Sequence, residues 1–215
     1  VNEDGGLGKA VSFQHYGSGP NVQRQKSPHV HGAIISPDNK TLFVTDLGID
    51  KVMLYDFDAT TGKLSPSKRP FIQSESGSGP RSFTFHNNNK FAYTIEELSG
   101  RVVLYHQKKG SLKEKQRIST MPADDKRFPG SADIHVSPDG KFLYASNRGE
   151  VNTIAIFSIN KKNGQLILIA HQSTLGKAPR NLNIELQSSE KKNYTIHFDK
   201  KPSSDQLLVR KAWLR

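Results

Sequence analysis

The chain has 215 residues, 34% of them hydrophobic, and a formal net charge of +11. It contains no cysteine, which excludes disulfides, thiol catalysis and thiolate metal sites. No apolar run approaches the roughly 18 residues of a membrane span, and the first residues lack the pattern of a signal peptide, so we predict no membrane association.

Three similar stretches recur along the chain, beginning at residues 36, 86 and 137, so that the interval is 50 and then 51 residues. Self-similarity of this kind is typical of a repeat architecture. Each copy is a turn rich in Pro, Asp, Asn and Gly between two apolar, alternating segments, which predicts a β-hairpin. The copies are Ser36-Pro-Asp-Asn-Lys-Thr-Leu-Phe-Val, His86-Asn-Asn-Asn-Lys-Phe-Ala-Tyr-Thr and Ser137-Pro-Asp-Gly-Lys-Phe-Leu-Tyr-Ala.

A third apolar run follows each hairpin, at residues 51–57, 101–105 and 152–159, and a shorter fourth segment follows that run. About four strands per 50 residues is the unit of a β-propeller blade. We therefore predict an all-β fold, a propeller with four-stranded blades, with about three complete blades and parts of blades on either side. Because the chain begins in what reads as the middle of a blade, the lack of a signal peptide says little, and we expect a cytoplasmic protein.

The positive charge could reflect a polyanionic partner such as nucleic acid. The lysines, however, are scattered through the predicted turns and outer strands, without the interleaved aromatic residues of a stacking platform. We interpret them as solvated blade edges and predict no nucleic-acid partner.

Unusual polar residues gather at one rim of the predicted blades, because the beginning of the first strand of a hairpin lies beside the end of the second. Glu97 and Arg148 each lie seven residues after a turn lysine, so they are expected to face the same way in neighbouring blades. Ala178-Pro-Arg180 repeats Gly79-Pro-Arg81 and adds a cation to the rim. The residues that precede or follow the hairpins are His31, Arg81, Asp133, Asp46, Glu96, Glu97, Asn147 and Arg148.

Each of these residues alone is an ordinary polar residue at a strand end. Together, a histidine, a carboxylate and several arginines at a channel mouth indicate the binding of an anionic substrate and the transfer of a proton. The planar fork of arginine matches carboxylate or phosphate oxygens. His29 and His31 face the same side of an extended segment, but two ligands are a weak metal signal against the usual three or four, and we predict no metal.

Many short motifs keep a common order and spacing over residues from about 5 to 184. They are Gly17-Ser-Gly-Pro-Asn-Val-Gln-Arg-Gln25, Pro28-His-Val-His31, Ser36-Pro-Asp38, Asp46-Leu-Gly-Ile-Asp50, Gly77-Ser-Gly-Pro-Arg81, Phe91-Ala-Tyr93, Glu97-Leu98, Ala132-Asp-Ile-His135, Ser146-Asn-Arg-Gly149 and Pro179-Arg-Asn181. In this order they resemble the propeller-type lactonases, the 6-phosphogluconolactonase group, whose relatives include carboxymuconate-cyclising enzymes.

The resemblance implies a seven-bladed propeller that opens or closes a lactone on a small, strongly anionic sugar acid or muconate. It implies no cofactor or metal. Carried over by position, the family's catalytic set falls on His31, Arg81, Glu97 and Arg148. We add His29, Asp46 and Arg180, from the same rim, as candidates for substrate binding.

The reaction that fits this set is hydrolysis of 6-phosphogluconolactone to 6-phosphogluconate, a step of the pentose phosphate pathway. Arginines would grip the phosphate and stabilise the oxyanion, while His31 or Glu97 activates water and protonates the leaving hydroxyl. The sequence does not divide these roles between His31 and Glu97. Two alternatives stay open: a catalytically silent propeller fragment or binding scaffold, and a muconate-type lactonising isomerase.

The chain departs from the resemblance in two ways. It holds about three blades rather than seven, and after Ile184 the pattern gives way to a basic stretch with seven Lys and Arg against four Asp and Glu. We therefore divide the chain into a partial lactonase-like propeller, residues 1–184, and an off-pattern basic tail, residues 185–215. The alternative for the tail is a divergent strand pair at residues 194–198 and 207–209.

A partial ring leaves blade faces without a neighbouring blade, which favours self-association through exposed apolar surface. The residues that we expect on such faces are Phe43, Val44, Phe142, Leu143 and Tyr144.

Overall fold

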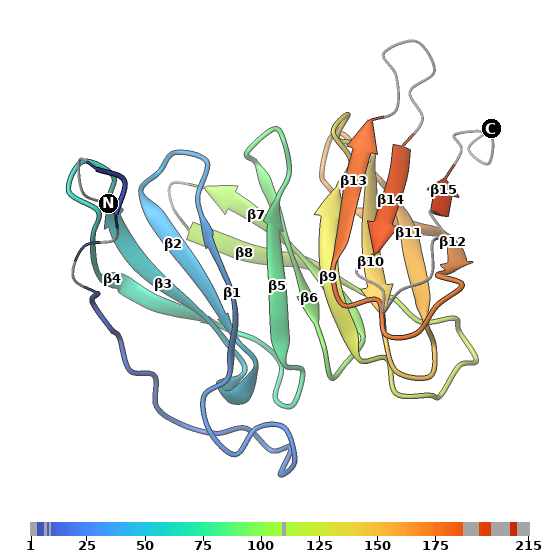
Figure 1. Cartoon of the computed structure of the whole chain (residues 1–215), viewed down its shortest axis with the longest axis horizontal. Helices are drawn as coiled ribbons and strands as arrows, with labels where there is room; N and C mark the ends of the chain where they lie inside the picture. Colours follow the sequence, from blue (N-terminus) through green and yellow to red (C-terminus); the bar gives the residue numbers. More distant parts are fainter. Residues whose placement is uncertain are drawn as a thin grey trace.

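The computed structural model describes residues 4–6, 8, 10–108, 111–186, 194–198 and 207–209. These residues form three four-stranded antiparallel sheets and one three-stranded sheet (Figure 1). Within each sheet the strands are neighbours in chain order, as in a propeller blade. In the described part of the chain, no helix has the length and apolar character needed to cross a membrane.

Each blade is built from consecutive strands. The first blade consists of β1 (Val30–Ile35), β2 (Thr41–Asp46), β3 (Lys51–Asp58) and β4 (Lys63–Gln73), with a short 3-10 helix, η1 (Leu47–Ile49), between β2 and β3. The second consists of β5 (Pro80–Phe85), β6 (Phe91–Glu96), β7 (Arg101–Lys108) and β8 (Ser111–Ser119). The third consists of β9 (Ser131–Val136), β10 (Phe142–Asn147), β11 (Thr153–Ile159) and β12 (Leu166–Ser173). The last, three-stranded sheet consists of β13 (Leu182–Leu186), β14 (Tyr194–Phe198) and β15 (Leu207–Val209).

The predicted propeller of four-stranded blades is confirmed, with hairpins β1–β2, β5–β6 and β9–β10 at the three repeats. The strand pair considered as the alternative for residues 185–215 is present, because β14 pairs with both β13 and β15. β13 also crosses the boundary that we drew after residue 184. The remaining residues of that stretch lie outside the described residues, so its status as a separate tail stays a prediction.

The residues that identify the repeat also hold its turn. The Ser36 hydroxyl donates to Oδ1 of Asp38 at 2.6 Å and accepts from the backbone N–H of Thr41 at 3.0 Å. Ser137 makes the same pair of contacts in the third blade. In the second blade His86 takes this place, and its Nδ1 accepts from the backbone N–H of Asn88 at 3.1 Å. Short polar side chains that bond to nearby backbone groups favour turns over strands.

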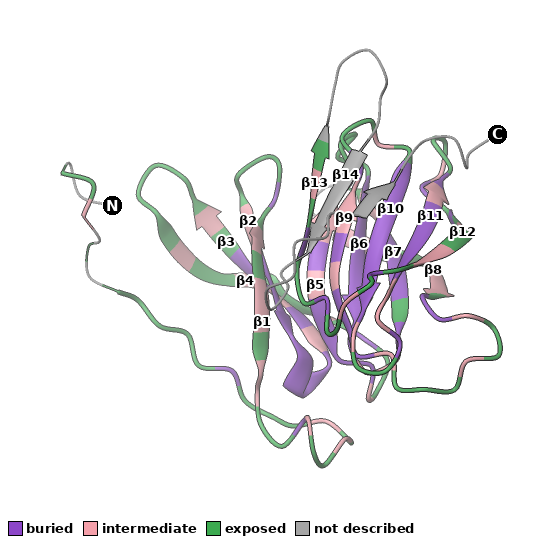
Figure 2. Ribbon diagram, turned by 45° about the vertical axis from the view of Figure 1, so that its right-hand side comes forward, coloured by how far each residue is buried: buried purple, intermediate pink, exposed green. Residues whose placement is uncertain are grey.

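The hydrophobic core lies between neighbouring blades, and buried residues concentrate in their middle strands (Figure 2). Between the first and second blades, the rings of Phe43 and Phe83 stack with centroids 5.1 Å apart. The largest cluster joins the second and third blades and includes Tyr93, Leu104 and Phe157. The first strands β1, β5, β9 and β13 follow one another across the arc (Figure 1), so the rim residues of different blades come close together.

The residues that we expected on open blade faces are buried instead. Phe142 and Tyr144 pack with Leu182 of β13, which covers the far face of the third blade. On the first blade, Phe13 of the N-terminal segment lies against Tyr55 with ring centroids 4.9 Å apart. That part of the expectation is wrong, because neighbouring segments cover these faces. The residues concerned are Phe43, Val44, Phe142, Leu143 and Tyr144.

Candidate active site

β-bulges turn two of the predicted site residues out of the strand ladder. The pairing of β1 with β2 passes from Val30 to Gly32, and that of β5 with β6 passes from Pro80 to Ser82. His31 and Arg81 are therefore the residues left out of the ladder in two neighbouring blades. A bulge bends the strand and changes the direction of a side chain, and bulges are common beside active sites.

Two further site residues follow directly after the second strands of their blades. These strands end at Asp46, Glu96 and Asn147, which are fully buried. Since side chains alternate along an extended chain, the next residue faces the other way. That residue is Glu97 in the second blade and Arg148 in the third.

Asp46 does not line the site, contrary to our prediction that it contacts substrate. Like Glu96 at the corresponding position of the second blade, Asp46 is fully buried. Its Oδ1 accepts from the backbone N–H of His29 at 2.7 Å, and its Oδ2 lies 2.6 Å from Nδ1 of His15. Asp46 thus holds the backbone of a pocket residue in place.

The chain reaches Arg81 through a left-handed glycine. Gly79 has φ +64°, and a Cβ atom there would lie 2.8 Å from Cγ of Leu98 and 3.1 Å from Cγ of Leu47. Because the backbone is left-handed and both leucine side chains are this close, only glycine fits the turn without strain. The backbone N–H of Gly79 donates to Oδ1 of Asp50 at 2.8 Å, which fixes the turn.

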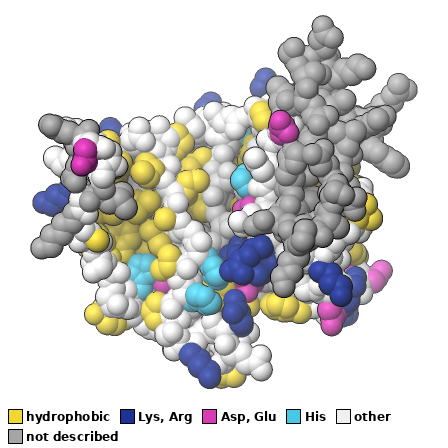
Figure 3. All heavy atoms as spheres, in the orientation of Figure 1, with side chains coloured by type: hydrophobic (Ala, Val, Ile, Leu, Met, Phe, Trp, Pro, Cys, Tyr) yellow, Lys and Arg dark blue, Asp and Glu magenta, His cyan; other side chains and the backbone are white. Residues whose placement is uncertain are grey.

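One pocket of about 420 Å³ brings most of the predicted residues together. On the face drawn in Figure 3, histidine and Lys or Arg side chains lie beside each other in the lower middle of the molecule. Arg81 lies behind the pocket wall, against Glu97. The pocket is lined by Arg24, His29, His31, Glu97, Phe128, Gly130, Arg148, Gly149, Ala178 and Arg180.

The Glu97 carboxylate is surrounded by three guanidinium groups. Its Oε1 accepts from Nη2 of Arg24 at 2.6 Å, and its Oε2 accepts from Nη2 of Arg148 at 2.6 Å. Nε of Arg81 is 3.0 Å from Oε2, in an ion pair without the angle of a hydrogen bond. Burial by itself would raise the pKa of Glu97, but the charges of Arg148, Arg24 and Arg81 outweigh it and lower the pKa. Glu97 is therefore a carboxylate at neutral pH.

His31 is held in its neutral form. Burial, assisted by the charge of Arg81, lowers its pKa to about 4, although Glu97 acts in the opposite direction. Its Nε2 is buried and has no hydrogen-bond partner among the described residues. The His31 ring lies next to that of His29, with centroids 4.5 Å apart. A neutral imidazole with an unused nitrogen can accept a proton from water.

Both inner arginines are fixed by backbone carbonyls. Nη1 of Arg81 donates to the carbonyl of Ala132 at 2.6 Å, and Nε of Arg148 donates to the carbonyl of Gly130 at 2.8 Å. The Arg81 bond joins the second blade to the third, and the Arg148 bond lies within the third blade. They hold the two cations in one orientation before any ligand arrives.

Two lining residues with large side chains, Arg24 and Phe128, were not among the predicted site residues. Arg24 lies in the segment before the first blade, and Phe128 lies in the loop between β8 and β9. Neither has a counterpart in the other repeats, so a comparison of repeats cannot find it. The available signal for Arg24 was its place in the Gly17–Gln25 motif, a few residues before His29 and His31.

The arrangement suits anion binding better than metal binding. Within the described ranges, no group of three or more His, Asp or Glu residues is placed to hold a metal ion. The pocket combines four arginine side chains with one carboxylate, counting Arg81 behind its wall. It can therefore bind a small, multiply charged anion and place it beside the neutral His31.

Comparison with known proteins gives a consistent result. The sequence model of the family described as "Lactonase, 7-bladed beta-propeller" matches residues 1–190. A 6-phosphogluconolactonase of Formosa agariphila is 43% identical over 188 residues, which are 86% of this chain and 53% of that protein. A 6-phosphogluconolactonase of Bacillus subtilis is 38% identical over 183 residues, which are 84% of this chain and 51% of that protein. The chain thus spans about half the length of these curated relatives.

Solved structures show the same similarity. The periplasmic gluconolactonase of Pseudomonas aeruginosa matches with a TM-score of 0.82 and 29% identity, covering 98% of this chain and 61% of that one. A protein from Lactobacillus plantarum matches with a TM-score of 0.79 and 32% identity, covering 98% of this chain and 62% of that one.

Proposed function

Since this chain belongs to the seven-bladed β-propeller lactonase family, we propose that it supplies the active site of a lactone hydrolase that opens 6-phosphogluconolactone to 6-phosphogluconate. The observation that carries the proposal is the pocket in which arginines surround Glu97 next to a neutral, unpartnered His31. The relatives named 6-phosphogluconolactonase support the choice of substrate.

His31 acts as the general base in this proposal. The imidazole of His31, which lines the pocket, takes a proton from water while the water oxygen forms a bond to the lactone carbonyl carbon. The resulting tetrahedral intermediate carries a negative oxygen. When the bond from this carbon to the ring oxygen breaks, the protonated His31 returns its proton to that oxygen. The product is a hydroxy acid, and the histidine is again neutral.

Arg148 and Arg81 stabilise the negative oxygen. Both guanidinium groups are held by carbonyl oxygens and by Glu97, so they need little reorganisation during the reaction. Arg148 lines the pocket, and Arg81 adds its charge from behind.

Glu97 is assigned to positioning rather than to proton transfer. Both of its oxygens already bind arginines, and its lowered pKa makes it a weak base. His31 in contrast keeps an unused nitrogen. This difference supports a division of roles that the sequence leaves open.

The proposal also places the protein in the cytoplasm. A phosphorylated sugar acid carries several charges and does not cross a lipid bilayer, so an enzyme that uses it belongs where it is made. The partner is then a small anionic sugar lactone, and no nucleic acid is involved.

Proton release provides a direct test, because each lactone that opens yields one carboxylic acid. A pH-stat follows the rate at neutral pH for this chain and for a longer natural chain that contains it, against the uncatalysed rate. His31→Asn should lower kcat/KM by about 100-fold to 10000-fold, the range of general base catalysis. Lys26→Ala, an exposed residue that does not line the pocket, serves as the control. Wild-type rates in His31→Asn would contradict its assigned role. If the longer chain does not exceed the uncatalysed rate, the proposed hydrolase is rejected and the alternative, a binding scaffold, is retained.

A further inference from the structure

The pocket contains two kinds of arginine, and we propose that they bind different parts of the substrate. Arg24 and Arg180 form an outer subsite for a phosphate monoester, while Arg81 and Arg148 serve the reacting carbonyl group. This inference rests on the proposed function, because it divides the cations of the same pocket.

Exposure separates the two pairs. The side chain of Arg81 is 7% exposed and that of Arg148 is 18% exposed, whereas that of Arg24 is 40% exposed. Arg180 is also exposed. The outer cations therefore lie at the mouth of the pocket, where a charged group at the far end of a substrate would remain.

Hydrogen bonding separates them in the same way. Arg81 and Arg148 are each fixed by a backbone carbonyl as well as by Glu97. Arg24 uses only its Nη2, which donates to Glu97, and leaves its Nε and Nη1 without a partner among the described residues. For Arg180, which lines the pocket, no hydrogen bond or ion pair is found within the part of the chain that the structure describes. The outer guanidinium groups thus keep the donors that bidentate binding of a phosphate needs.

The charges of the site agree with such a ligand. Among the described lining residues, three guanidinium groups face one carboxylate, a surplus of two positive charges, and Arg81 adds its charge from behind the wall. A phosphate monoester carries about 1.5 to 2 negative charges near pH 7, and a lactone carbonyl develops one more in the transition state. An unphosphorylated lactone would leave the outer charges unused.

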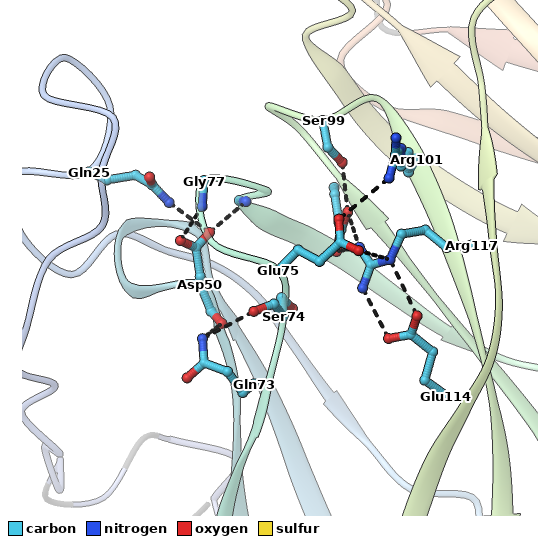
Figure 4. A network of polar contacts seen from close by, with 12 residues as sticks. Gln25, Asp50, Gln73, Ser74, Glu75, Gly77, Ser99, Arg101, Glu114 and Arg117 are labelled. Carbon is cyan, nitrogen blue, oxygen red and sulfur yellow. Dashed lines mark hydrogen bonds and ion pairs between the residues drawn. The ribbon is translucent and has the colours of Figure 1, made fainter.

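The segment that carries Arg24 is anchored before ligand binding. Oδ1 of Asn21 accepts from the backbone N–H of Arg24 at 3.0 Å, and the side chain of the fully buried Gln25 donates to Oδ1 of Asp50 at 2.7 Å. The same carboxylate accepts from the backbone N–H of Gly77 at 2.7 Å (Figure 4). Asp50 therefore ties the Arg24 segment to the turn that leads to Arg81. A subsite held in this way binds with a smaller loss of conformational entropy.

Binding of two products that differ only by the phosphate tests the proposal. Calorimetric titration of this chain compares 6-phosphogluconate with gluconate, and the wild type should bind the phosphorylated acid at least about tenfold more tightly. Arg24→Ala and Arg180→Ala should each weaken 6-phosphogluconate binding by about tenfold or more and change gluconate binding much less. Lys26→Ala and Lys177→Ala are matched controls, since each removes an exposed cation that does not line the pocket from the same segment.

The following outcomes of the titrations would contradict the proposed phosphate subsite. Equal affinity of the wild type for the two acids, failure to bind either, or equal losses for both acids in the variants would overturn the subsite. Arg180→Ala removes an exposed side chain, and a urea titration of the variant checks that its folding is unchanged. Binding that depends on Arg24 and Arg180 without any lactone hydrolysis would reject the proposed function and retain the subsite.

Discussion

Glu97 shows how a single residue organises the candidate site. It is the one carboxylate that lines the described pocket, and its two oxygens hold arginines from the N-terminal segment, the second blade and the third blade. Without it, three cations would repel one another across a small space. The residue that looks most like an acid–base catalyst thus serves to assemble the charges around it.

A Glu97→Gln substitution should therefore lower stability as well as activity. Removing one partner of a buried ion pair leaves its counterions uncompensated, and we expect a loss of about 3 kcal/mol in the free energy of unfolding. Urea titration measures this loss. Addition of inorganic phosphate should recover part of it, because an anion can replace the missing charge. A variant as stable as the wild type, or one insensitive to phosphate, would show that Glu97 does not organise these arginines.

The pH dependence of activity should reveal the state of His31. With a pKa of about 4, compared with an ordinary value of 6.5, the ring stays neutral and able to accept a proton well below pH 6. We expect kcat/KM to stay level from pH 7 to about pH 5 and to fall only as the pH approaches 4. A fall centred near pH 6.5 would contradict the assignment.

The same pKa affects stability, which provides the control for that experiment. The folded state takes up the His31 proton near pH 4, whereas the unfolded chain takes it up near 6.5. The contribution of His31 to stability is therefore complete above pH 6.5 and is lost as the pH falls toward 4. Circular dichroism at each pH separates a loss of folded protein from a loss of catalysis.

Sequence reasoning selected most of the ionisable residues that the structure brings to the candidate pocket, but not those, such as Arg24, that lie outside the repeat. The equal offset of Glu97 and Arg148 from the turn lysines led to their common orientation. The same alternation groups Asp46 with the buried Glu96, so its place in the site was the weakest part of the prediction. Arg24 could not be placed, because it reaches Glu97 only through a folded N-terminal segment whose bonds to Asp50 no sequence pattern displays.

At the level of elements, the bulges and turns before the first strands decide where the side chains point. Spacing predicted the hairpins but not the bulges at His31 and Arg81, because the extra residue is defined only by the pairing across the strands. The glycine turn before β5 is the clearest case in which local backbone geometry serves the site. Its sequence, Gly77-Ser-Gly-Pro-Arg81, is informative only once the contacts of Gly79 are known.

Two glycine substitutions separate backbone strain from steric fit. Gly62, with φ +71°, has no atom within 4 Å of an added Cβ, whereas Gly79, with φ +64°, has leucine carbons at 2.8 to 3.1 Å. Gly62→Ala should cost about 1 kcal/mol from the left-handed backbone alone. Gly79→Ala should cost about 2 kcal/mol more, because the turn or the leucines must move. It should also reduce lactonase activity by displacing Arg81. Equal losses of stability in urea titration would show that the fit at Gly79 is loose.

At the level of the whole molecule, the repeat period was enough to predict the architecture. Each blade is completed by residues close in sequence, so local patterns determine most of the pairing. The covering of the end blades was not predicted, because it comes from non-repeating segments, Phe13 on the first blade and Leu182 on the third. The divergent strands β14 and β15 carry a hairpin pattern too weak to decide from sequence.

The arc described here still exposes apolar surface on its outer strands, which leads to our last prediction. Ile167 is 66% exposed and Ile169 is 37% exposed, and both lie on β12 with Leu166 and Leu168 pointing toward the core. Two isoleucines exposed on the same face of an edge strand favour strand-to-strand contact between copies of the chain. We expect this chain to self-associate in sedimentation velocity at micromolar concentration.

A single charge on that edge should weaken the association. Ile167→Lys places an ammonium group where two copies would meet, and a lysine on an edge strand opposes pairing. Val22→Lys is the matched control, since Val22 is a β-branched residue that is 75% exposed on the N-terminal segment and the substitution makes the same change in charge. The expected result is a shift toward monomer for Ile167→Lys and none for Val22→Lys. Equal shifts would attribute the effect to net charge, and a monomeric wild type would show that this edge is already protected.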